Sequence, residues 1–116
     1  MHQSDLSDFQ SGLQGCETAL LADVETGTCL VSASTLKIGQ EQLDVLCRRA
    51  QLYLTDLPPQ PELQCLLPSP KGTHAFFRLS ACDPEALCLT FAPNAPLDGI
   101  EQAALGFLTQ TLQQVV

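Results

Sequence analysis

Residues 19–34, with the sequence ALLADVETGTCLVSAS, place two runs of strand-forming residues around a short glycine-containing turn. Such a pattern predicts a β-hairpin. In the first run, Leu20 and Ala22 face one side by alternation, whereas Ala19 faces the other. Both sides of this strand are apolar. We therefore expect a central strand that is covered on both faces.

The flanking segments have helical periodicity. Apolar residues recur at helical spacing in 5–14 and again in 97–115, so each segment is predicted to form a helix. Residues 1–4 are expected to be disordered. The segment 39–56 is predicted to form an amphipathic helix. Its apolar stripe consists of Leu43, Leu46, Cys47, Ala50 and Leu54.

Three more runs, at 62–67, 73–80 and 86–92, have the composition of strands and are separated by proline- and glycine-containing turns. The predicted order of elements is α-ββ-α-βββ-α. The economical packing is a single α/β (α+β) domain over residues 1–116, with one five-stranded antiparallel sheet between helices.

The charge balance excludes several classes of partner. Five Lys and Arg against thirteen Asp and Glu give a net charge of −8 and a pI near 4.3. Arg48-Arg49 is the only adjacent pair of cations, so nucleic acid is not an expected partner. The apolar runs are too short to cross a membrane and the N-terminus does not resemble a signal peptide, so we expect a cytoplasmic protein.

The six cysteines do not form a recognisable metal or disulfide framework. No C-x-x-C pair and no paired histidine spacing accompany them. Most lie in apolar runs, where cysteine behaves as a small hydrophobic residue. We therefore predict reduced, metal-free thiols at Cys16, Cys29, Cys47, Cys65, Cys82 and Cys88.

The sequence also shows no recognisable arrangement of catalytic residues. The two histidines are His2, near the N-terminus, and His74, which we expect on a strand as a partly buried or rim residue. The sequence contains no G-x-S-x-G, no G-x-G-x-x-G and no phosphate-binding loop. We therefore expect neither an enzyme nor a bound cofactor. Arg48 and Arg49 are the candidates for contacts with a protein partner.

The predicted strand at 62–67 suggests how the chain assembles. In an antiparallel sheet of this order it would lie at an edge, where an apolar strand is poorly protected against pairing. Pairing with a second copy about a two-fold axis, with Gln64–Cys65 near the axis, would cover this edge. The helices 39–56 would then meet on one face of the sheet. The predicted dimer interface consists of Val45, Leu52, Tyr53, Leu63, Gln64, Cys65, Leu66 and Leu67.

The hairpin at 19–34 resembles the signature hairpin of the roadblock/dynein light chain family: an apolar strand, a D-x-x-x-G turn and a strand ending in small polar residues. The elements that follow are similar to that family in order and spacing. This resemblance implies a roadblock/longin fold and a dimer in which the third strands pair. It also implies a non-enzymatic scaffold or regulator that binds a Ras-like small GTPase, or an adaptor subunit of a larger complex.

Two other classes of protein remain open. Acidic, dimeric chaperones of bacterial secretion systems are also small α/β proteins, and the segment PLDGIEQAALGFL at 96–108 is similar to their closing helix. A sensory domain of the PAS or profilin-like type is the second alternative. In such a domain a small ligand would lie between a helix and the sheet.

Overall fold

The computed structural model describes residues 3–35, 39–55, 64–78 and 84–113. Its elements follow the predicted order α-ββ-α-βββ-α. They are α1 (Gln3–Ser11), β1 (Cys16–Asp23), β2 (Thr28–Ser34), α2 (Gln40–Thr55), β3 (Gln64–Ser69), β4 (Gly72–Phe77), β5 (Glu85–Phe91) and α3 (Ile100–Gln113).

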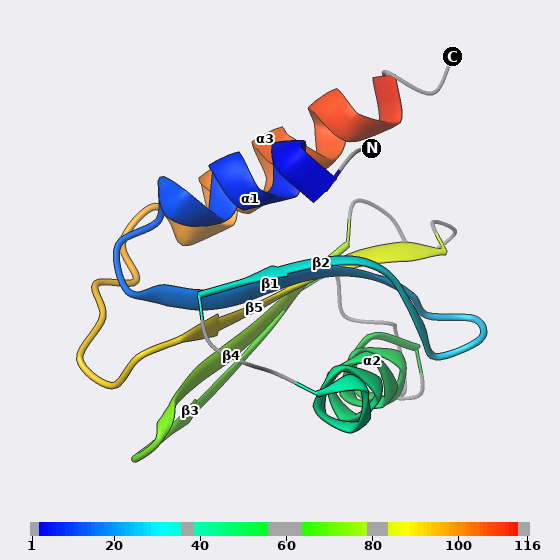
Figure 1. Ribbon diagram of the computed structural model, residues 1–116, viewed down its shortest axis with the longest axis horizontal. Coiled ribbons are helices and arrows are strands. Elements are labelled where there is room, and N and C mark those ends of the chain that lie inside the picture. The colour runs from blue at the N-terminus through cyan, green and yellow to red at the C-terminus, as the bar shows by residue number, and fades with distance from the viewer. Residues whose placement is uncertain (1–2, 36–38, 56–63, 79–83, 114–116) are drawn as a thin grey trace.

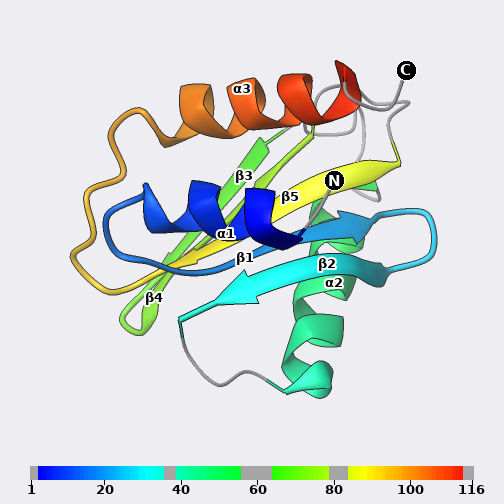
Figure 2. The same cartoon turned by 45° about the horizontal axis from the view of Figure 1, so that its top comes forward.

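The five strands form one antiparallel sheet in the order β2-β1-β5-β4-β3. Helices α1 and α3 lie on one face of this sheet and α2 lies on the other, so the fold has three layers (Figure 1). The turned view shows α1 and α3 side by side over the strands, with α2 beneath them (Figure 2). The predicted fold class is confirmed.

The core is divided between the two faces of the sheet. Ala19 and Leu21 of β1 pack with α1 and α3, whereas Leu20 and Ala22 pack with α2. The apolar stripe predicted for α2 is buried in this second cluster along its whole length. The alternation expected for a strand covered on both faces is therefore confirmed.

The hairpin turn between β1 and β2 is held by the side chain of Asp23. Its carboxylate accepts hydrogen bonds from the backbone N–H of Glu25 at 2.9 Å and of Thr26 at 3.3 Å. Gly27 closes the turn with a φ of +71°, a conformation that glycine adopts without steric cost. Aspartate and glycine in this turn thus determine its backbone conformation.

The C-terminal end of α2 is tied to the sheet by Arg78. This side chain is only 2% exposed, and its Nη2 donates a hydrogen bond to the carbonyl oxygen of Leu54 at 2.6 Å. The last carbonyl groups of a helix have no partner within the helix, so this contact satisfies one of them. The orientation of α2 relative to the sheet is fixed at this end.

Several predicted element boundaries differ from those observed. Helix α1 occupies Gln3–Ser11 rather than 5–14, so its first residues are helical where disorder was expected; residues 1 and 2 lie outside the described part. The helix ends before Gly12, earlier than expected. Helix α3 begins at Ile100, directly after Gly99, whose φ of +77° is not helical.

The strand predicted at 62–67 is observed at Gln64–Ser69. Pro68 was expected to end it, but Pro68 lies within the strand and pairs with Thr73. Proline is tolerated in an edge strand when its nitrogen faces away from the neighbouring strand. Strands β4 and β5 begin one residue earlier than predicted, and β4 ends at Phe77 rather than at residue 80.

Candidate functional site

Strand β3 lies at one edge of the sheet, as predicted, and pairs with β4 in an unbroken register from Gln64↔Phe77 to Ser69↔Gly72. Within the described residues, its other side has no neighbouring strand. Strand β2 forms the opposite edge, and a register shift at Leu21/Ala22 interrupts its pairing with β1. Such irregularities protect an edge, so β3 is the edge better suited to pairing.

Pro68 indicates which backbone groups of β3 point outward. Since proline cannot donate to the ladder, its nitrogen must face the open side of β3. Backbone groups of alternate residues in a strand point to the same side. Hence Gln64 and Leu66 direct their N–H and C=O groups away from β4, toward the open edge.

The side chains predicted for the interface divide between the two faces of the sheet. Leu66 is 51% exposed, and its register partner Ala75 belongs to the cluster beneath α1 and α3. Leu67 is partly buried against the α2 cluster. Because successive side chains of a strand point to opposite faces of the sheet, Leu66 and Leu67 lie on different faces. Leu63, and the side chains of Tyr53, Gln64 and Cys65, lie outside the described part.

Helix α2 has an exposed apolar surface, which we call the α2 flank and define as Val45 and Leu52. They are 49% and 48% exposed and lie two helical turns apart on one side of the helix. Arg48 and Arg49 lie between them and are also exposed. The structure therefore brings the cations and the flank together on one helix surface.

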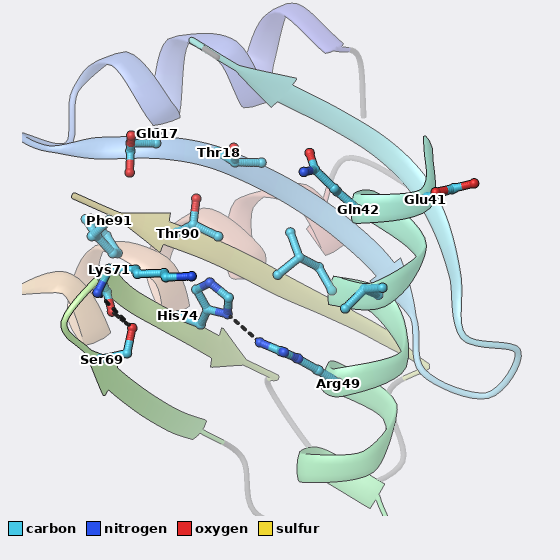
Figure 3. A pocket seen from close by; sticks show the side chains of 13 residues that line it. Glu17, Thr18, Glu41, Gln42, Arg49, Ser69, Lys71, His74, Thr90 and Phe91 are labelled. Carbon is cyan, nitrogen blue, oxygen red and sulfur yellow. Dashed lines mark hydrogen bonds between the residues drawn. The ribbon is translucent and has the colours of Figure 1, made fainter. Parts of the chain in front are cut away.

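A pocket that sequence analysis did not find lies between α2 and the sheet, with a volume of about 580 Å³ (Figure 3). Its polar lining includes Arg49, Lys71 and His74. The Nη1 of Arg49 lies 3.3 Å from Nδ1 of His74. The remaining lining residues are Glu17, Thr18, Glu41, Gln42, Val45, Leu46, Ser69, Gly72, Thr90 and Phe91.

The state of His74 follows from its surroundings. Burial lowers the pKa of its imidazole, and the positive charge of Arg49 lowers it further. The ring is therefore neutral at pH 7. Arginine can only donate hydrogen bonds, so Nδ1 of His74 accepts and the ring proton lies on Nε2. The expectation of a partly buried histidine on a strand agrees with the structure, which places His74 on β4.

Three thiols lie on the α2 side of the sheet: Cys29, Cys47 and Cys88. Burial raises the pKa of each, to about 12 for Cys47. Burial also raises the pKa of Cys16, on the other face, to about 11. All four are free and remain protonated at neutral pH. Cys82, and the side chain of Cys65, lie outside the described part.

Among the described residues, no group of three or more His, Cys, Asp or Glu side chains is placed to hold a metal ion. Likewise, none of the helices described here has the length and apolar character needed to span a membrane.

Comparison with known proteins relates this architecture to solved structures. The sequence matches no protein-family model and no curated protein. A roadblock/LC7 domain from Streptomyces avermitilis superimposes with a TM-score of 0.80 over 98% of this chain and 97% of its own, at 9% identity. The chain has the roadblock/LC7 fold. The resemblance inferred from the hairpin is thus confirmed at the level of the fold.

Two further structures with this fold are similar to the chain. Myxococcus xanthus MglB has a TM-score of 0.73 and 10% identity, with coverage of 99% of this chain and 92% of that one. A structure described as MglB with a tetrameric arrangement has a TM-score of 0.69 and 18% identity, with coverage of 97% and 88%. At such low identity, the likeness concerns the fold alone.

Proposed function

We propose that this chain is a cytoplasmic, non-enzymatic scaffold or regulator that acts as a homodimer. Its partner is a Ras-like small GTPase, or it serves as an adaptor subunit of a larger complex. The observation that carries the proposal is the open edge of β3 together with the exposed α2 flank, Val45 and Leu52. Both features leave apolar or hydrogen-bonding surface uncovered in the single chain.

In the proposed dimer, two β3 strands pair antiparallel about a two-fold axis near Gln64–Cys65. The outward N–H and C=O groups of Gln64 and Leu66 then form the ladder between the copies. The two sheets become one, and both α2 helices lie on the same face of it. The MglB structure with a tetrameric arrangement provides a precedent for self-association of this fold.

We place the GTPase on α2. This helix carries the exposed cations Arg48 and Arg49, and arginine is enriched at protein interfaces. The sequence contains no phosphate-binding loop, so the nucleotide belongs to the partner. The outer helices α1 and α3 are the alternative surface.

A nucleotide-dependent capture experiment tests the partner. The full chain is immobilised and exposed to extracts of its source cells, one loaded with GDP and one with a non-hydrolysable GTP analogue. Bound proteins are quantified by mass spectrometry. We expect a small GTPase that is retained in one nucleotide state only. Retention of a secreted effector instead would favour the chaperone alternative.

Two variants with the same change in net charge distinguish the surfaces. Arg48→Gln removes a positive charge from α2, and Gln102→Glu adds a negative charge to an exposed position of α3. We expect Arg48→Gln alone to weaken retention of the GTPase. If neither nucleotide state retains a GTPase, the proposed GTPase partner is wrong and only the adaptor role remains.

A further inference from the structure

The pocket between α2 and the sheet gathers accessible cations of a strongly acidic chain. The protein has five Lys and Arg residues against thirteen Asp and Glu. Two of the five, Arg49 and Lys71, line this pocket together with His74. Of the remaining cations, Arg78 is buried and already donates to a backbone carbonyl of α2. Two of the five cations of the chain thus line the same cavity, which also contains two carboxylates, Glu17 and Glu41.

Arg49 and His74 are in contact within the pocket, and Lys71 lines the same pocket. Figure 3 shows the ammonium group of Lys71 pointing toward the imidazole of His74, with the guanidinium of Arg49 on the other side of the ring. Because Nδ1 of His74 accepts from Arg49, its Nε2–H is a donor. Arg49 and Lys71 have donors only. Three neighbouring side chains therefore offer N–H groups to a common ligand.

The charges of Arg49 and Lys71 are not paired directly with a carboxylate among the described residues. The pocket's own acidic residues, Glu17 on β1 and Glu41 on α2, lie far from each other in Figure 3 and pair with neither cation. An anion bound in the pocket would supply the ionic partner that both side chains lack among the described residues.

The rest of the lining limits the kind of anion. Val45 and Leu46 contribute apolar surface, while Thr90 offers a hydroxyl group. The volume of about 580 Å³ lies within the range of small-molecule sites, roughly 300–1,000 Å³. A ligand that fits this lining has one oxyanion group and an apolar body.

We propose that this pocket binds a small organic anion, whose carboxylate or phosphate group lies between Arg49, Lys71 and His74. The apolar body of the ligand contacts Val45 and Leu46. This inference goes beyond the scaffold role, because it adds a small-molecule site to a protein-binding fold. The ligand would lie between α2 and the sheet.

Titration of the isotope-labelled full chain with three probes tests the proposal. Benzoate supplies a carboxylate, phenyl phosphate a phosphate ester, and benzamide a neutral analogue of benzoate. Amide shifts of Gly72, His74 and Thr90 report binding. We expect saturable shifts with at least one anion and an affinity for benzamide at least about tenfold lower, since hydrogen bonds to charged groups are strong. The tighter anion identifies the preferred oxyanion.

Variants then assign the site. Lys71→Gln and Arg49→Gln should each weaken the bound anion about tenfold, the loss of one charge-assisted hydrogen bond. Gln102→Glu on α3 changes the net charge equally and should alter affinity by less than about twofold. The amide spectra of all variants establish that they remain folded.

Three results would each overturn the inference. They are no saturable shift at up to about 20 mM of either anion, equal binding of benzamide, or pocket variants no weaker than Gln102→Glu. Because the titration uses no GTPase, these results are independent of the proposed partner. Failure of the partner experiment would likewise leave the pocket standing.

Discussion

Replacement of Leu52 by alanine tests the proposed dimer through the α2 flank. Leu52 is 48% exposed in the single chain, so about half of its side chain remains to be covered by a second copy. Full burial of a leucine side chain contributes about 1.5–3 kcal/mol, so covering the exposed half contributes about 1 kcal/mol. A two-fold dimer contains this contact twice, which gives about 2 kcal/mol. Leu52→Ala should therefore raise the dissociation constant about thirtyfold.

Sedimentation equilibrium over a dilution series measures this dissociation constant directly. Leu30→Ala is the matched control, because Leu30 is 51% exposed but lies on β2, at the other edge of the sheet. The control should dimerise like the wild type. Both variants should unfold at nearly the same urea concentration as the wild type when monomeric, since neither removes a buried contact.

The reasoning fails if Leu52→Ala dimerises as tightly as the wild type. It also fails if Leu30→Ala is weakened to the same extent, which would move the interface to the β2 edge. A wild-type chain that sediments as a monomer at micromolar concentration would exclude the dimer altogether.

Two further pairs of substitutions test the backbone. Gln64→Pro removes an outward N–H from β3 and should shift the dimer toward monomer in the same sedimentation assay. Gln64→Ala keeps that N–H and should leave the dimer unchanged. If the two variants dimerise equally, the interface lies elsewhere. Gly72→Ala should lower the free energy of unfolding by more than about 2 kcal/mol, since Gly72 has a φ of +134° and the added Cβ would overlap the carbonyl oxygen of Phe91. Gly99→Ala, at a φ of +77° but with nothing within 4 Å, should cost only about 1 kcal/mol by urea denaturation; equal losses would refute the steric argument.

The sequence predicts the layered architecture because burial follows from short-range patterns. Strict alternation in β1 places Leu20 and Ala19 on opposite faces, and the structure buries both. The period of the α2 stripe likewise identifies the buried side of that helix. Both patterns depend only on residues within one element, so a single sequence contains them in full.

Element boundaries are less predictable, because they depend on contacts made elsewhere in the fold. Pro68 reads locally as the end of a strand, yet it remains within β3 since its nitrogen faces the open edge. Whether this proline ends the strand or is tolerated within it depends on which side of β3 is paired with another strand. That information comes from the order of all five strands and not from the residues around the proline.

The pocket could not be predicted from the sequence for the same reason. Arg49 comes from α2, His74 from β4 and Lys71 from the turn between β3 and β4, and no local motif connects them. The register pair Leu67↔His74 explains the arrangement, since it places His74 on the α2 face of the sheet. A histidine at that register position lies under α2 whatever its neighbours in sequence.

Helix α2 thus takes part in both the proposed protein contacts and the proposed anion site. Val45 belongs to the α2 flank and also lines the pocket, and Arg49 lies one helical turn further along the same side. An anion held by Arg49 would therefore alter the surface that a second copy or a GTPase contacts. Linkage requires the effect to be reciprocal: whatever factor the anion imposes on association, association imposes on the affinity for the anion. If both proposals hold, occupation of the pocket would change the association of this chain, with α2 as the shared element.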